Sequence, residues 1–189
     1  MTTQRWPTAW LMTDERMGDR LWPAIDCAAD VGAGIIFRHH ATDMERRAVI
    51  GRRIADMAHR RGLVLGVAGD AVLARELGAR MVHNPRETTL GLPFSRSVHE
   101  EGEAAAAMAD GAALAFVSPV YPTRSHPSAA ALGEKGAARL AMLAGVPAYA
   151  LGGVDPARQH RLRELGFAGW AGIDAWLALA ERRGLRGFG

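Results

Sequence analysis

The sequence predicts a single compact (β/α)8 barrel that spans residues 1–189. Short apolar runs alternate with helix-length segments eight times, and this order is typical of parallel strands joined by crossover helices. One run, residues 34–38, has three consecutive large apolar side chains, as expected for a strand that is covered on both faces. Eight such units favour closure into a barrel. A doubly wound open sheet is the alternative.

The first two units can be followed directly along the chain. Residues 9–13 are expected to form the first strand, and residues 19–31 a helix with apolar side chains near helical spacing. After the strand at 34–38, Thr42 is expected to cap the next helix, with Glu45 three positions further on in a capping box. That helix should end at Gly62.

The third unit is short and the fourth is reduced. Residues 63–68 are predicted to be a strand, and residues 70–77 a short helix that ends at a glycine. Residues 80–83 should form the fourth strand. The stretch 84–92 that follows has a loop composition where a helix would be expected. The barrel therefore lacks a full fourth helix.

The second half of the chain supplies four further units. The strands are expected at residues 93–98, 114–117, 148–151 and 169–172, and the helices at 100–110, 134–144, 156–165 and 173–182. Asp155 should cap the helix at 156, because a proline follows it in the first turn. The long stretch 118–131 contains three prolines, and a loop of this length in a compact domain is usually functional or mobile.

The composition excludes several classes of protein. The formal net charge is +3, and Lys135 is the single lysine, so the positive charge is almost all arginine. Arginine favours bidentate contacts with phosphate, but no basic run is long enough for a nucleic-acid tract, and we expect no nucleic-acid partner. No apolar run is long enough to cross a membrane, and no signal peptide is visible. A cytoplasmic location is expected, and a homo-oligomer is possible.

The residues that follow the strands are the candidate site, because the carboxyl ends of barrel strands carry function and the last two loops commonly bind phosphate. Gly152 and Gly153 follow the seventh strand, where a glycine pair lets backbone amides approach a phosphate. Gly172 and Ile173 follow the eighth strand and can supply the other half of this cradle. A tight turn without a ligand is the alternative interpretation of the glycine pair.

Two further strand ends carry charged or titratable side chains. If the chain stays extended after the second strand, Arg38 and His40 lie on one side and can grip a diphosphate. The neighbouring histidines also suggest a metal-binding site, but no third ligand follows at a spacing that is typical of zinc sites. Asp70 follows the third strand and can either bind Mg²⁺ through a carboxylate oxygen or cap the next helix.

The loop after the sixth strand offers hydroxyl, guanidinium and imidazole groups. It begins Ser118-Pro119-Val120-Tyr121-Pro122-Thr123 and continues Arg124-Ser125-His126. Thr123 and Ser125 are candidate substrate-binding residues, and His126 is a candidate catalytic residue. A loop with these groups is able to close over a bound ligand.

Taken in order, these segments resemble the thiamine phosphate synthase/TenI family over nearly the whole chain. The segments concerned are Trp10–Asp14, Arg38-x-His40, Gly69-Asp70, the loop from Ser118 to Thr123, Ala150–Val154 and Ala171–Ile173. The loop is the most specific match, since the family has Gly-Pro-Val-Phe-Pro-Thr there. The resemblance implies a synthase that joins a pyrimidine methyl diphosphate to a thiazole phosphate with the help of Mg²⁺ and releases diphosphate.

The resemblance also assigns roles to single residues. It places Arg38, His40 and Asp70 at the diphosphate, and Thr123, Gly153 and Ile173 at the thiazole phosphate. The chain departs from the family pattern at several positions: histidine replaces lysine at His40 and His126, glycine replaces asparagine at Gly69, Asp174 replaces a serine, and no second carboxylate follows the fourth strand.

Two other functions are therefore kept open. One is a TenI-like isomerisation of the thiazole, in which His40, His83 or His126 would act as the acid or base. The other is a barrel that binds a ligand without catalysis, as a regulator. Dependence on magnesium separates the synthase from the isomerase.

Overall fold

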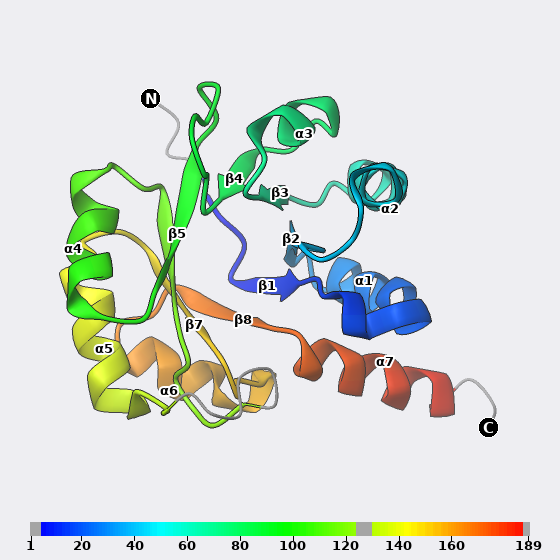
Figure 1. Cartoon of the computed structure of the whole chain (residues 1–189). Helices are drawn as coiled ribbons and strands as arrows, with labels where there is room; N and C mark the ends of the chain where they lie inside the picture. Colours follow the sequence, from blue (N-terminus) through cyan, green and yellow to red (C-terminus); the bar gives the residue numbers. More distant parts are fainter. Residues whose placement is uncertain (1–4, 124–129, 187–189) are drawn as a thin grey trace.

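The computed structural model describes residues 5–123 and 130–186, and its strands form a closed parallel barrel. The strands lie in sequence order around the ring, so each one pairs with its neighbours in the chain and β8 pairs with β1 (Figure 1). They are β1 Ala9–Met12, β2 Gly34–Phe37, β3 Leu65–Ala68, β4 Met81–His83, β5 Phe94–Val98, β6 Leu114–Val117, β7 Ala148–Leu151 and β8 Gly169–Gly172. The predicted barrel is confirmed.

Helices surround this barrel in the order that the sequence predicts. They are α1 Leu21–Asp30, α2 Met44–Arg60, α3 Ala71–Glu76, α4 Glu101–Ala109, α5 Gly133–Leu143, α6 Gln159–Glu164 and α7 Asp174–Arg186, with 3-10 helices η1 Glu15–Arg20 and η2 Pro156–Arg158. In Figure 1 the last helix, α7, lies beside α1, while the two ends of the described chain lie on opposite sides of the view. None of the described helices is both long and apolar enough to cross a membrane.

The fourth unit is reduced, as predicted. The chain passes from β4 to β5 through turns and bends, without a helix in residues 84–93. An arginine of β5 covers part of the exposed outer wall here. The guanidinium of Arg96 lies 5.3 Å from the ring centroid of Phe94, and it donates to Asp110 at the end of α4 over 2.9 Å.

Two details of the predicted helix starts are wrong. The N-cap of α2 is Asp43 rather than Thr42: the Asp43 side chain accepts a hydrogen bond from the backbone N–H of Arg46 over 2.9 Å. Because the helix begins at Met44, Glu45 stands too early to complete a capping box. The helix predicted at 19–31 begins earlier, as η1, with a kink at Gly18 (φ +50°).

The barrel interior is filled by aromatic side chains, which leaves room for a ligand only at its end. Trp10 is fully buried, and its ring meets those of Phe116 and Tyr149 edge-on at centroid distances of 5.8 and 6.0 Å. Gly34 makes space for this ring, since a Cβ there would lie 2.3 Å from it. The middle of the barrel is therefore closely packed, and a ligand site is expected at the strand ends and in the loops that follow them.

The seam between β1 and β8 closes through unusually close backbone packing. A Cβ on Gly169 would lie 1.9 Å from the carbonyl oxygen of Thr8. That carbonyl accepts a hydrogen bond from the N–H of Trp170 over 3.0 Å. The indole N–H of Trp176 on α7 donates to the carbonyl of Trp10 over 2.9 Å, which anchors the last helix against the first strand.

Candidate functional site

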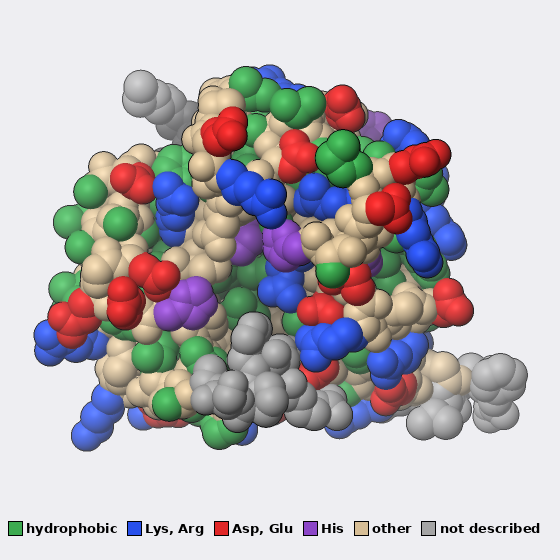
Figure 2. All heavy atoms as spheres, viewed as in Figure 1, with side chains coloured by type: hydrophobic (Ala, Val, Ile, Leu, Met, Phe, Trp, Pro, Cys, Tyr) green, Lys and Arg blue, Asp and Glu red, His purple; other side chains and the backbone are tan. Residues whose placement is uncertain are grey.

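A pocket of about 440 Å³ opens at the carboxyl ends of the strands. Figure 2 shows histidine and arginine side chains gathered around the hollow in the middle of this face. We call it the strand-end pocket, and its described lining consists of Arg38, His83, Ser97, His99, Ser118, Pro119, Pro122, Thr123, Leu151, Gly152, Gly153, Val154, Asp155, Gly172, Ile173, Asp174 and Ala175. Seven of the candidate residues from the sequence meet here: Arg38, His83, Thr123, Gly152, Gly153, Gly172 and Ile173.

The remaining predicted residues lie elsewhere. His40 and Asp70 line a second hollow, of about 350 Å³, between the start of α2 and the β4–β5 loop. The expectation that Arg38 and His40 share one side is wrong, because His39 has a positive φ of +34° and the chain turns there instead of staying extended. Ser125 and His126 fall in residues 124–129, which lie outside the described part of the chain.

The glycine pair after β7 has a packing role that the sequence did not indicate. Gly152 and Gly153 have φ values of +90° and +63°. A Cβ on Gly152 would lie 2.9 Å from the Cα of Pro119, and one on Gly153 would lie 2.6 Å from the carbonyl oxygen of Pro122. The backbone N–H of Tyr121 donates to the carbonyl of Gly152 over 3.0 Å. The two glycines thus bring the loop with Thr123 against the turn after β7.

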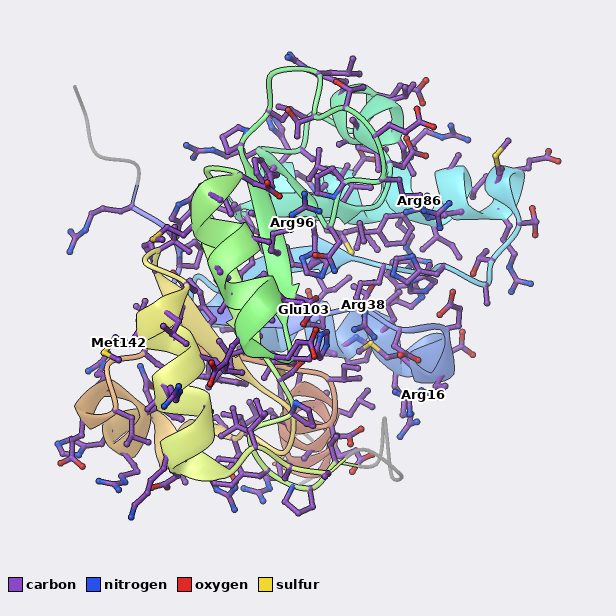
Figure 3. The ribbon with its side chains drawn as sticks, turned by 60° about the vertical axis from the view of Figure 1, so that its left-hand side comes forward. Arg16, Arg38, Arg86, Arg96, Glu103 and Met142 are labelled. Atoms are coloured by element: carbon purple, nitrogen blue, oxygen red, sulfur yellow. The ribbon has the colours of Figure 1, made fainter. Side chains whose placement is uncertain are left out.

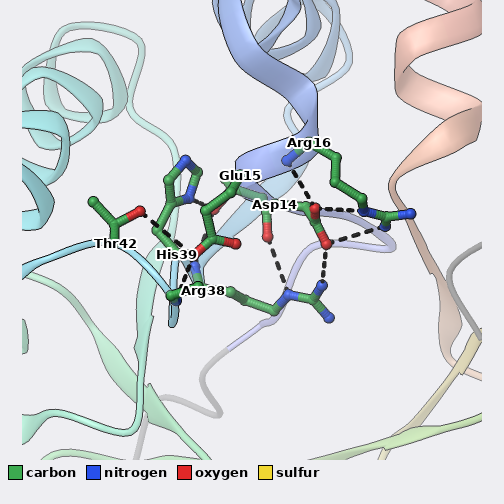
Figure 4. A network of polar contacts seen from close by, with 8 residues as sticks. Asp14, Glu15, Arg16, Arg38, His39 and Thr42 are labelled. Carbon is green, nitrogen blue, oxygen red and sulfur yellow. Dashed lines mark hydrogen bonds and ion pairs between the residues drawn. The ribbon is translucent and has the colours of Figure 1, made fainter.

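Arg38 is held in place by a clamp of oxygen acceptors (Figure 4). Its Nε donates to the carbonyl of Thr13 and its Nη2 to the carboxylate of Asp14, each over 3.0 Å. Arg16 grips the same carboxylate from the solvent side over 2.7 Å. Burial raises the pKa of Asp14, but the hydrogen bonds from Arg16 and the charge of Arg38 outweigh it and lower the pKa to about 2. Asp14 is therefore ionised and fixes the direction of the arginine.

The clamp leaves one nitrogen of Arg38 for a ligand. Within residues 5–123 and 130–186, Nη1 of Arg38 has no hydrogen-bond partner, and the side chain lines the strand-end pocket. Burial lowers the pKa of Arg38, and the carboxylate of Asp14 opposes this effect. A guanidinium keeps its proton in proteins, so the pocket contains one oriented positive charge.

A buried polar network includes two more lining residues of the pocket, His83 and Ser97. His83 is 5% exposed; its Nδ1 lies 3.0 Å from the hydroxyl of Ser95, and its Nε2 lies 3.4 Å from that of Ser97. Asn84 donates its side-chain amide to the Ser97 hydroxyl over 2.8 Å and accepts from the Ser97 N–H over 2.7 Å. The Ser97 hydroxyl proton is therefore free to point at His83 Nε2 or at a ligand.

The network is uncharged. Burial, reinforced by the nearby charge of Arg38, lowers the pKa of His83 to about 3. Only His83 was a candidate from the sequence. Ser97 and Asn84 were missed, although the alternation of serine through β5 was a signal that one face of this strand is polar and points into the barrel.

Because His83 is neutral in the folded protein and titrates near pH 6.5 when unfolded, stability should fall on acidification. The unfolded state binds one more proton than the folded state between about pH 6.5 and pH 3, so stability rises with pH across this window. From pH 7 to pH 5 this residue should cost about 2 kcal/mol. Urea unfolding of wild type and His83→Gln at several pH values measures this contribution to the free energy of unfolding. Equal pH slopes for the two proteins would contradict the buried neutral imidazole.

The strand-end pocket also contains two acidic side chains. Asp155 caps η2 by accepting from the N–H of Arg158, as predicted, and Asp174 opens α7. Both line the strand-end pocket together with Arg38. A carboxylate repels a phosphate by about 1 kcal/mol at ~4 Å in water and by more when partly buried. An anionic group is therefore expected close to Arg38 and out of direct contact with these two carboxylates.

The second hollow contains the aspartate that the resemblance assigns to Mg²⁺. Asp70 caps α3, since its Oδ1 accepts from the N–H of Leu73 over 2.9 Å, and its Oδ2 lies 3.5 Å from Nη1 of Arg47. The part of the chain that the structure describes contains no group of three histidine, cysteine or acidic residues able to hold a metal. One carboxylate oxygen of Asp70 accepts the helix-cap hydrogen bond and the other faces the guanidinium of Arg47, so Asp70 does not fit the role of a ligand to a resident Mg²⁺.

Histidine at position 40 does not supply the positive charge of a lysine. Burial lowers the pKa of His40, and the guanidinium groups of Arg38 and Arg47 lower it further. The imidazole is consequently neutral near pH 7. The cationic groups beside this hollow are arginines.

Comparisons with known proteins identify the family and the fold. The family model described as thiamine monophosphate synthase matches residues 9–176. Thiamine-phosphate synthases of Mycobacterium bovis and Mycobacterium tuberculosis are each 32% identical over 126 residues, which cover 60% of this chain and 56% of theirs. The match thus spans little more than half the length of these curated relatives.

Solved structures show the same fold. Thiamine phosphate pyrophosphorylase from Pyrococcus furiosus superimposes with a TM-score of 0.78 at 20% identity, covering 90% of this chain and 87% of that one. The structure titled native KDPGal gives 0.61 at 15% identity, with 97% and 98% covered. The family model covers most of the chain, and on that ground the protein belongs to the thiamine monophosphate synthase family.

Proposed function

We propose that this protein acts in thiamine biosynthesis and joins a pyrimidine methyl diphosphate to a thiazole phosphate with release of diphosphate. The observation that carries the proposal is the strand-end pocket. It brings Arg38, Thr123 and Gly153, which the family resemblance assigns to the two phosphorylated substrates, into one space of about 440 Å³. This volume suits small molecules.

The reaction needs charge stabilisation more than proton transfer. The thiazole nitrogen attacks the methylene carbon of the pyrimidine while the bond from that carbon to the diphosphate oxygen breaks, and the electron pair leaves with the diphosphate. Arg38 offers its free Nη1 to the oxygen on which negative charge develops. Its clamp by Thr13 and Asp14 fixes the guanidinium beforehand, so little reorganisation is needed during reaction.

The other walls would orient the substrates. The Thr123 hydroxyl and the backbone beside Gly153 face the same space and can bind the thiazole phosphate. The uncharged pair of His83 and Ser97 offers hydrogen bonds to a ring edge without adding charge. Asp174 also lines this space, and its carboxylate would disfavour a phosphate in direct contact with it.

The alternative of thiazole isomerisation needs an acid–base group whose pKa lies near the working pH. Burial lowers the pKa values of His83 and His40, the first to about 3. This favours the synthase over an isomerase that would use either residue. His126, the third candidate, lies outside the described residues.

The test is direct product analysis. Purified protein is incubated with both substrates, with Mg²⁺ in one arm and EDTA in the other, and thiamine phosphate and diphosphate are measured by mass spectrometry. We expect both products. Measurable binding of thiazole phosphate without any thiamine phosphate in either arm would refute the synthase and leave the ligand-binding barrel.

A further inference from the structure

We propose that Arg47 and Arg86 form a metal-independent binding site for a diphosphate group in the second hollow. The inference rests on the proposed function, because diphosphate is the leaving group of that reaction. The second hollow is lined by His40, Thr42, Met44, Arg47, Ala68, Gly69, Asp70, Ala71, Val72, Arg86, Glu87 and Thr88. The two arginines take the place that the family pattern gives to a metal.

Arg47 is a rigidly held cation. It comes from the first turn of α2 and reaches under the end of β3, where its Nη2 donates to the carbonyl of Ala68 over 2.7 Å. Its guanidinium lies 5.5 Å from the ring centroid of Phe37, and the side chain is only 13% exposed. The buried Nε atom has no hydrogen-bond partner within the described residues. The geometry fixes the planar group before any ligand arrives.

Arg86 approaches the same hollow from the β4–β5 loop. Within the described ranges it makes no ion pair or hydrogen bond with the protein. A Cβ on Gly69 would already touch its Nε at 3.4 Å, and Gly69 has a φ of +75°. The Arg86 side chain therefore packs against the glycine, and a longer side chain at position 69, such as the family's asparagine, would compete with it for this space.

The two guanidinium groups act on each other. Burial lowers the pKa of Arg47, the carboxylate of Asp70 raises it, and the positive charge of Arg86 lowers it again. The carboxylates of Asp70 and Glu87 also line the hollow and offset part of the positive charge. One oxygen of Asp70 is already used, because it accepts the hydrogen bond that caps α3. An anion between the arginines relieves their mutual repulsion.

The chemistry of arginine favours a diphosphate over a single halide or carboxylate. A guanidinium forms bidentate hydrogen bonds to phosphate oxygens, and two of them can span two linked phosphoryl groups. Figure 3 shows Arg86 on the same side of the barrel as Arg38, which lines the strand-end pocket. The charges of Arg38, Arg47 and Arg86 all act on His40, a lining residue of the second hollow, so a diphosphate held there is close to Arg38.

The test measures binding of inorganic pyrophosphate by calorimetry, in EDTA and again in Mg²⁺, with inorganic phosphate as the second probe. We expect binding in EDTA, with phosphate weaker. Arg86→Gln should weaken pyrophosphate binding at least about tenfold, as expected for the loss of a charge-assisted contact. The matched control is Arg80→Gln, because Arg80 is exposed at the opposite end of β4 and its loss changes the net charge equally.

Arg47→Lys serves as the second variant, since it keeps the positive charge but not the planar fork, and should also weaken binding. Binding that requires Mg²⁺, or equal affinity for Arg86→Gln and wild type, would overturn the inference. An equal loss of pyrophosphate affinity in Arg80→Gln would show that the effect comes from net charge and not from a site at Arg86. These outcomes do not depend on turnover: pyrophosphate binding in EDTA without any thiamine phosphate would reject the synthase and keep the site.

Discussion

Gly169→Ala is expected to destabilise the barrel by about 3 kcal/mol, at the upper end of the usual cost of overpacking. The new methyl group would lie 1.9 Å from the carbonyl oxygen and 2.6 Å from the carbonyl carbon of Thr8. Both atoms are backbone, so no side chain can rotate away. The seam between β1 and β8 must open locally, and the hydrogen bond from Trp170 to Thr8 is strained with it.

Thermal and urea unfolding followed by circular dichroism measures this effect, and the midpoint should fall by about 6–12 °C. Gly184→Ala is the matched control, because Gly184 lies in α7 with no atom within 4 Å of the added methyl group. The same change there should raise stability by about 0.5–1 kcal/mol, since alanine favours a helix. A Gly169 variant as stable as wild type would contradict the close seam.

Arg38→Met should weaken the binding of thiazole phosphate or pyrimidine methyl diphosphate about thirtyfold, which corresponds to about 2 kcal/mol for a charged hydrogen bond. The substitution removes the oriented positive charge from the strand-end pocket. It also leaves the Asp14 carboxylate, whose side chain is 14% exposed, nearer to the ligand with Arg16 as its remaining partner. Product formation should fall by at least the same factor.

Arg16→Gln is the control for this experiment. This substitution also removes a guanidinium that pairs with the Asp14 carboxylate. The Arg16 side chain, however, is 53% exposed and is not among the described lining residues of the strand-end pocket. Calorimetry on both variants, with circular dichroism as a check of folding, separates the two arginines. If both variants bind the ligands as wild type does, the oriented guanidinium plays no part in recognition.

The architecture could be predicted from the sequence because its signals are periodic and local. Apolar runs of strand length separated by helix-length segments specify a barrel, and the reduced fourth unit was visible as a loop composition in residues 84–92. Capping was harder, since Thr42 and Asp43 are adjacent and either side chain can cap. Asp43 caps the helix, while the Thr42 hydroxyl lies 3.4 Å from Glu15.

The site was predictable only in part, because side chains far apart in sequence meet through backbone turns that no local pattern reveals. The positive φ of His39 sends Arg38 and His40 to different hollows. Arg86 lies against Gly69 in the second hollow, although 17 positions separate the two residues in the chain. Nothing in the residues around Arg86 signals that proximity, which depends on the geometry of neighbouring strands.

The short β4–β5 connection changes what the outer wall of the barrel is made of. At the other strands a helix shields the outer face of the barrel from water. Between β4 and β5 one long side chain covers part of that face instead. The Arg96 stem and guanidinium lie over Phe94, and its hydrogen bond to Asp110 ties the strand to the end of α4. A chain of 189 residues can thus close an eight-stranded barrel without a helix between β4 and β5. The loop that replaces this helix carries Arg86 to the second hollow.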